Sequence, residues 1–360
     1  MPFAAARTPW WTWVSLVIAW AVIGITAAIG VTGLIAAVAA ATLVVAVFAA
    51  VYHAEVVAHR VGEPFGTLVL AVAVTIIEVA LIVSFMVRGG AAEAGLARDT
   101  VFASVMISCN GIVGLCLLLG GARYREQGFQ IQGASAALAV LTALTTLTLI
   151  LPNVTTTPGP MFSTPQLVFA GLASLILYGS YVFVQTIRHR DYFLPVKTKN
   201  KDAHAPRPAA RQALLSAGLL LAALLAVVGL AKALTPMLES GIARAEAPRT
   251  VVGVIIAIIV LLPEGLAAVG AARANRLQTS LNLALGSALA SIGLTIPAVA
   301  VVSIVLDQPL QLGLGAKDEI LLALTALVGV ITLGTGRTTV LQGIVHLVIF
   351  GAFLFLAVMP

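Results

Sequence analysis

The chain has 360 residues, of which 60% are hydrophobic and only 9% are charged. Soluble domains carry roughly a quarter charged residues, so this composition excludes an ordinary soluble domain. The net charge of +6 could suggest a nucleic-acid partner, but the cations are scattered between apolar runs, where they report membrane topology. We therefore expect the lipid bilayer, and no nucleic acid, to be the main partner of the chain.

Eleven apolar runs follow one another along the sequence with short polar segments between them. A hydrocarbon core about 30 Å thick is crossed by roughly 20 apolar residues in a helix, whereas strands of a membrane barrel alternate in polarity. The fold class is therefore an all-α integral membrane protein with about eleven transmembrane helices. The predicted helices span residues 10–29, 34–52, 66–87, 100–120, 134–151, 167–187, 213–234, 251–271, 281–305, 320–335 and 340–358.

The first run follows Arg7 as a signal peptide would, but its length and the second run close behind predict a retained span. The longest polar segment, residues 188–211, contains seven cations and three prolines and is expected to be a linker. The sequence thus predicts an extra helix at 1–30, a five-helix repeat at 31–187, a basic cytoplasmic linker at 188–212 and a second five-helix repeat at 213–360.

Threading eleven helices alternately through a membrane distributes the twenty Lys and Arg residues unevenly. With the N-terminus inside, fourteen of them face the cytoplasm and six face the other side. Cytoplasmic loops are enriched in Lys and Arg, so the bias predicts a cytoplasmic N-terminus and a periplasmic C-terminus.

The two halves share a motif around one glutamate each. Aligning residues 75–83 (TIIEVALIV) with residues 261–269 (LLPEGLAAV) superposes Glu78 on Glu264. Glu78 falls in the third predicted helix and Glu264 in the eighth, and this odd offset turns the second copy upside down, as in many secondary transporters. Pro263 and Gly265 beside Glu264 further predict a discontinuous helix there.

The predicted helix after each glutamate carries two serines four residues apart, which share one helical face. These polar side chains are candidate ligands or pathway-lining groups, although Ser, Asn and Gly also mediate close packing between membrane helices. His346, in the last predicted helix, is expected to be a packing or pathway residue. The candidate ligands beside the glutamates are Thr75, Ser104, Ser108, Asn110, Asn282, Ser287 and Ser291.

An ionisable residue in the bilayer centre costs about 2.5–3.5 kcal/mol on insertion scales, so it usually faces a cavity and has a function. Of the fourteen acidic residues, only Glu78 and Glu264 are predicted at that depth. Carboxylate and hydroxyl oxygens suit a hard cation such as calcium, and protons compete for the same carboxylates. If the empty, doubly charged site cannot cross the membrane, this competition produces antiport.

Three segments carry a resemblance to a known family: residues 62–82 (GEPFGTLVLAVAVTIIEVALI), 99–117 (DTVFASVMISCNGIVGLCL) and 262–297. They resemble the two repeat motifs of the calcium/cation antiporter superfamily, and most closely its bacterial ChaA-type calcium/proton antiporters. The resemblance implies an inverted pair of five-helix repeats with one extra leading helix, and one essential glutamate in each repeat, here Glu78 and Glu264.

The resemblance also implies a function: exchange of cytoplasmic Ca²⁺, with Na⁺ or K⁺ as alternatives, for protons by alternating access in a bacterial inner membrane. A sodium-coupled calcium exchanger and a cation channel with the same glutamate pair remain alternatives. Without a nucleophile or histidine cluster at depth, we expect no enzyme and no cofactor. The partners are inorganic cations and protons, and the sequence leaves the oligomeric state open.

Overall fold

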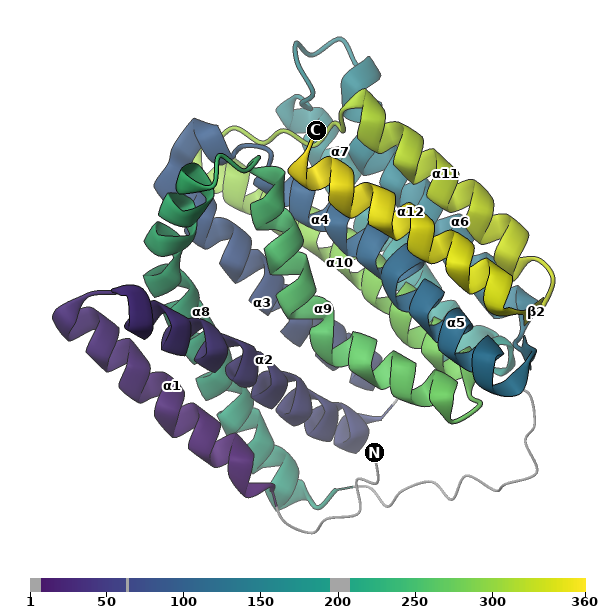
Figure 1. Cartoon of the computed structure of the whole chain (residues 1–360), viewed down its shortest axis with the longest axis horizontal. Coiled ribbons are helices and arrows are strands. Elements are labelled where there is room, and N and C mark those ends of the chain that lie inside the picture. Colours follow the sequence, from purple (N-terminus) through teal and green to yellow (C-terminus); the bar gives the residue numbers. More distant parts are fainter. Residues whose placement is uncertain (1–7, 63–64, 195–207) are drawn as a thin grey trace. The chain divides into compact units, whose positions relative to one another are not determined.

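The computed structural model describes residues 8–62, 65–194 and 208–360. These residues are almost entirely helical (Figure 1), which confirms the all-α fold. The α-helices are α1 (Trp10–Ile29), α2 (Gly33–Val61), α3 (Phe65–Gly89), α4 (Leu96–Met106), α5 (Val113–Tyr124), α6 (Ile131–Thr145), α7 (Thr164–Phe183), α8 (Ala210–Arg244), α9 (Thr250–Arg273), α10 (Leu277–Leu306), α11 (Ala316–Leu333) and α12 (Val340–Val358).

Short elements extend or join these helices. Three are π-helical, η2 (Ile107–Ile112), η3 (Thr146–Ile150) and η5 (Val184–Arg188), and three are 3₁₀-helical, η1 (Gly90–Glu93), η4 (Leu151–Val154) and η6 (Arg190–Phe193). Strands β1 (Gln127–Gly128) and β2 (Arg337–Thr338) pair antiparallel.

The helix count agrees with the sequence once α4, η2 and α5 are taken as one span, Leu96–Tyr124. In the described part of the chain, ten helices are long and apolar enough to cross a membrane. The eleventh expected span is α11, whose 18 residues include Lys317, Asp318 and Glu319 in the first turn.

Several helices are longer than predicted. The helices α2, α8 and α10 contain 29, 35 and 30 residues. Hydropathy marks only the apolar part of a helix, and a tilted or protruding helix continues beyond that part. The predicted break beside Glu264 was wrong, because α9 runs continuously through Pro263. Pro263 removes one backbone donor from the helix without ending it.

The described residues within 1–88 and 199–246 form one compact unit, here called unit 1, which contains α1, α2, α3 and α8. Small residues let its helices approach closely, since Ala39, Ala46 and Ala50 of α2 are fully buried. The Arg60 side chain at the end of α2 donates a 3.4 Å hydrogen bond to the carbonyl of Pro208, just before α8. This contact sets α2 and α8 antiparallel.

The described residues within 89–198 and 247–360 form unit 2, which contains the remaining helices. Its centre is the span of α4, η2 and α5, of which 89% of the most apolar stretch is buried. Helices α9, α10 and α12 pack around this span, and α6 and α7 pack against α10. The core therefore surrounds the predicted helix that carries Ser104, Ser108 and Asn110.

Two pairings in unit 2 repeat with the halves exchanged. Helix α5 of the first half packs against α12 of the second, and α10 of the second half packs against α7 of the first (Figure 1). These are the third and fifth helices of each predicted repeat in both cases. Such reciprocal contacts are the pattern that an approximate two-fold relation between halves produces.

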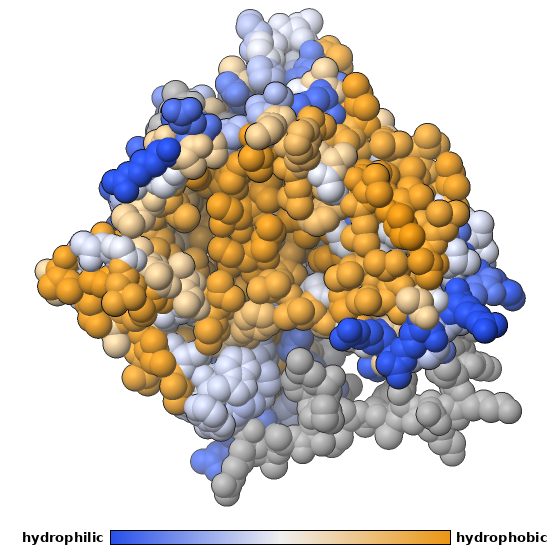
Figure 2. Space-filling model, viewed as in Figure 1, coloured by the Kyte–Doolittle hydropathy of each residue, from blue (hydrophilic) through white to orange (hydrophobic). Residues whose placement is uncertain are grey.

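The outer surface of unit 2 suits a lipid environment. Figure 2 shows apolar side chains over α11 and α12, with hydrophilic residues gathered at the end near β2. Leu341, Val348 and Phe355 of α12 are each more than 60% exposed. Exposed apolar surface of this extent is expected where a helix faces hydrocarbon. The chain is a multi-pass membrane protein.

Helix α12 depends on Gly343 to reach α5, because a Cβ atom there would lie 2.8 Å from the Leu118 Cα. We expect Gly343→Ala to lower the free energy of unfolding by about 1–3 kcal/mol through this overpacking. Thermal unfolding in detergent measures the change. Gly351→Ala is the matched control on the same helix, since nothing lies within 4 Å of its added Cβ. Equal melting temperatures for the two variants would contradict the close approach.

Candidate functional site

Glu78 lies near the middle of α3 in unit 1 and is only 1% exposed. Thr75, three residues earlier on the same face, is also buried. The sole other charged residue of this helix is Arg88, in its last turn. The structure therefore places the first predicted carboxylate in an apolar helix, away from both of its ends.

Glu264 lies in α9 of unit 2 and is 8% exposed. Its neighbour Gly265 faces η2, where an added Cβ would lie 3.2 Å from the Ile112 Cδ1. Pro263 has no N–H, so the carbonyl of Ile259 loses its usual helical donor one turn before the glutamate. Glu264 thus lies next to the point where α9 packs against η2. Because Glu78 and Glu264 belong to different units, their convergence stays a prediction.

Both serine pairs lie on helices that pack against α9. Ser104 and Ser108 are fully buried on α4 and η2, whereas Ser291 is buried and Ser287 half-buried on α10. Helices α4, η2 and α10 all contact α9. Unit 2 therefore brings the two pairs onto the helices around that of Glu264, although their role as ligands stays a prediction.

The Ser108 hydroxyl has no hydrogen-bond partner among the described residues. It belongs to the π-helical segment η2, in which one extra residue widens the turn and disturbs the regular backbone ladder. Such segments are frequent at functional sites. The sequence marks its polar residues Ser108 and Asn110, but contains no proline or other local pattern that predicts a π-helical turn there.

The amide of Asn110 binds protein groups away from α9. It donates a 2.8 Å hydrogen bond to Thr325 Oγ1 of α11, and its oxygen lies 3.0 Å from His346 Nδ1 of α12. Asn110 is fully buried. These contacts account for both of its amide atoms, and its predicted role as an ion ligand receives no support from them.

Asn282 lies in the second turn of α10, five residues before Ser287, and contacts the end of η6. It donates a 2.6 Å hydrogen bond to the Phe193 carbonyl and accepts one of 2.9 Å from Gln278. This side chain joins α10 to the described beginning of the predicted linker. Residues 195–207, which hold most of the predicted linker, lie outside the described residues.

Charged pairs gather where α9 begins. Arg98 forms a 2.8 Å ion pair with Asp99, and Arg249 forms one of 2.5 Å with Glu93. Gly253 packs against the backbone of Asp99 there, since an added Cβ would lie 2.8 Å from its carbonyl carbon. These acidic residues fall at span ends, as predicted, and leave Glu264 as the carboxylate within α9.

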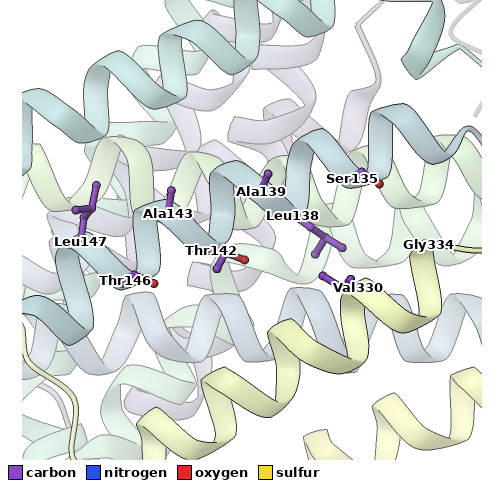
Figure 3. Close-up of a pocket in the computed structure, with 9 residues that line it drawn as sticks. All are labelled: Ser135, Leu138, Ala139, Thr142, Ala143, Thr146, Leu147, Val330 and Gly334. Atoms are coloured by element: carbon purple, nitrogen blue, oxygen red, sulfur yellow. The ribbon is translucent and has the colours of Figure 1, made fainter.

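A groove of about 660 Å³ lies on unit 2 between α6, η3 and α11 (Figure 3). Its polar side chains are Ser135, Thr142 and Thr146, and no charged residue lines it. None of the predicted site residues contributes to it. Among the described residues there is also no cluster of three His, Cys, Asp or Glu side chains. A cation site built from these described residues would therefore combine few carboxylates with hydroxyl and carbonyl oxygens.

Comparisons with known proteins place this geometry in context. The family described as sodium/calcium exchanger protein matches residues 31–187 and 215–359. A protein named "Putative ionic transporter y4hA", from Sinorhizobium fredii (strain NBRC 101917 / NGR234), is 56% identical over 315 residues, which cover 86% of this chain and 84% of that protein. The sodium-potassium/proton antiporter ChaA of Escherichia coli (strain K12) is 36% identical over 307 residues, covering 84% and 83%.

The fold also resembles that of a solved transporter. The native structure of YfkE, a Ca²⁺/H⁺ antiporter, superposes with a TM-score of 0.73 at 18% identity and covers 97% of this chain and 100% of that one. Similarity at this level of identity concerns the arrangement of helices.

The crossing of α9 over η2 can be tested through Gly265. We expect Gly265→Ala to lower the melting temperature, because its Cβ would press on the Ile112 Cδ1 at 3.2 Å. Ile112→Val removes that atom, so the double variant should regain most of the lost stability. Additive losses in the double variant would show that the two residues do not meet.

Proposed function

Because the chain belongs to the sodium/calcium exchanger protein family, we propose that it exchanges cytoplasmic cations for protons across a bacterial inner membrane. Calcium is the proposed main substrate, with sodium and potassium as further cargo. The observation that carries the proposal is the burial of Glu78 and Glu264, each inside an apolar helix. The ChaA-type resemblance of the sequence and the name of the relative ChaA support proton coupling.

The two carboxylates explain the exchange. A buried carboxylate is costly unless a cation or a proton neutralises it. Two carboxylates with hydroxyl and carbonyl oxygens suit Ca²⁺, and two protons can replace that charge. Either load gives a neutral site, whereas the empty site carries two negative charges. If only the neutral forms change their orientation, cation movement is coupled to opposite proton movement.

The neighbouring helices favour protons over sodium as the coupling ion. Between residues 100 and 120 and between residues 281 and 305, the polar side chains apart from cysteine are Ser, Thr and Asn. A third or fourth carboxylate would add fixed charge and favour further cations. Ser104, Ser108, Ser287 and Ser291 offer neutral oxygens, so the net charge of the proposed site is set by the glutamates.

Alternating access is the proposed route. Each compact unit has its own packed core, and the proposed site draws one glutamate from each unit. Rigid bodies that rock around a midplane site are the usual arrangement in transporters with inverted repeats. Glycines such as Gly253 and Gly343 keep the helices of unit 2 in close contact, as a rigid body requires.

Exchange in proteoliposomes tests the glutamate pair. With an imposed pH gradient, we expect Glu78→Gln and Glu264→Gln each to reduce calcium-dependent proton flux by more than about tenfold, because glutamine cannot cycle between charged and protonated forms. A pH-sensitive dye inside the vesicles measures the flux. Glu126→Gln is the control, since this glutamate is half exposed and its Arg337 partner lies 3.7 Å away. Normal exchange in either buried variant would remove that residue from the mechanism.

The same vesicles separate the alternative functions. Calcium, sodium and potassium are added separately, and the cation that collapses the pH gradient is the substrate. Calcium uptake that requires sodium and leaves pH unchanged would identify a sodium-coupled exchanger. Flux that does not saturate and needs no counter-ion would identify a channel.

Thiol labelling tests the proposed orientation, with the N-terminus in the cytoplasm. Both natural cysteines, Cys109 and Cys116, are buried, so the wild type should label weakly. In right-side-out membrane vesicles, an impermeant maleimide should label Glu246→Cys, whereas Arg276→Cys should require permeabilisation. The reverse pattern would mean that the chain is inserted the other way.

A further inference from the structure

A buried polar network joins α12 to η2 in unit 2. His346 is 1% exposed, and its Nδ1 lies 3.0 Å from Asn110 Oδ1, while its Nε2 lies 3.2 Å from Thr332 Oγ1. Asn110 in turn donates a 2.8 Å hydrogen bond to Thr325 Oγ1. Helices α11 and α12, which are consecutive in sequence, therefore meet the distant segment η2 through four buried side chains.

The direction of each hydrogen bond follows from the donors present. The Thr325 hydroxyl donates to the Leu321 carbonyl at 2.7 Å, so it accepts from Asn110 Nδ2. The amide oxygen of Asn110 thus faces His346, and because this oxygen is an acceptor only, His346 Nδ1 carries the proton. In the neutral ring, Nε2 then accepts from the Thr332 hydroxyl.

This network holds the one irregular turn of the central span. On one side of η2, Ile112 meets Gly265 beside Glu264. On the other side, an added Cβ at Gly114 would lie 3.0 Å from the His346 Cβ, so α12 lies close against the span. Ser108, with its buried hydroxyl, lies two residues before Asn110. Asn110 and Ser108 therefore belong to the same irregular segment.

The reciprocal pair, α10 with α7, shows that this helix contact does not itself need such a network. Aligning Ser104 and Ser108 with Ser287 and Ser291 superposes Asn110 on Gly293. Gly293 packs directly on Tyr178 of α7, where an added Cβ would lie 2.7 Å from the Tyr178 Cβ. Helix α10 is α-helical throughout at this point. The pair of α12 with the span of α4, η2 and α5 carries the π-helical turn together with the Asn110 and His346 contact.

We propose that His346 is a positioning residue, which acts through Asn110 to hold η2 in the geometry that the transported cation requires. The inference rests on the proposed cation exchange. His346 does not touch the cation. Its loss leaves the acceptor of Asn110 buried and without its donor, and η2 relaxes toward a regular helix that turns Ser108 away. The affinity for the cation falls, while the maximal rate of exchange changes little.

Three replacements of His346 separate this role from packing. Asparagine places an amide N–H near the position of the lost Nδ1, glutamine places one near that of Nε2, and leucine supplies neither. We expect His346→Leu to raise the KM for calcium on the order of tenfold, with kcat within about twofold. His346→Asn should recover most of the affinity and His346→Gln little of it. Thr332→Val, which removes only the Nε2 contact, should leave KM close to that of the wild type.

A double-mutant cycle shows whether His346 acts through Asn110. In the Asn110→Leu background, His346→Leu should cause no further rise in KM, because the shared hydrogen bond is already gone. Thermal unfolding of every variant is recorded, so that a fall in stability is measured apart from KM. Wild-type exchange confirms the assay and the proposed function independently of these variants.

Three outcomes would overturn the inference. The first is an unchanged KM in His346→Leu, and the second is equal KM values for the leucine and asparagine variants. The third is an undiminished rise in KM when Asn110 is already leucine. If the first outcome is accompanied by a loss of stability, the network is a packing feature.

Discussion

The cost of a carboxylate in hydrocarbon is the constraint on which the site depends. Glu78 and Glu264 are both buried within apolar helices, where an uncompensated charge is strongly unfavourable. A glutamate in this position is stable only when it is protonated or close to a cation. The chemistry of the proposed exchange therefore follows from burial, and the surrounding helices have only to bring oxygen ligands close and keep them in place.

Close helix packing meets that need without a hydrophobic driving force, since lipid tails are as apolar as the helix surfaces. Gly253 sets α9 against the start of α4, Gly265 sets it against η2, and Gly343 sets α12 against α5. Each contact fixes a helix next to the central span of unit 2. The glycines support the proposed site in this way, because an ion ligand binds well only when its backbone is held in position within a few tenths of an ångström.

The features that follow from whether a residue faces lipid, water or protein could be predicted from the sequence. Hydropathy identifies the transmembrane helices. A single glutamate within an apolar run is expected to be buried inside the protein, because exposure to lipid is costly. The π-helical turn, the continuous course of α9 through Pro263 and the partners of Asn110 were not predicted. Asn110 and His346 are 236 residues apart, and the hydrogen bond between them depends on tertiary packing that no local pattern encodes. The meeting of Glu78 with Glu264 is a prediction of the same non-local kind.

The reciprocal pairs α5 with α12 and α7 with α10 show where the two similar halves differ. In the pair α7 with α10, Tyr178 packs against Gly293. In the pair α5 with α12, His346 instead hydrogen-bonds to Asn110. The aromatic contact needs no buried hydrogen bond, whereas the polar contact requires every buried donor and acceptor to have a partner. A buried polar network adds little stability over an apolar contact, so its occurrence beside η2 is better explained by the geometry that it imposes. The asymmetry lies where the irregular turn meets the helix of Glu264, which is the part of the core nearest to the proposed chemistry.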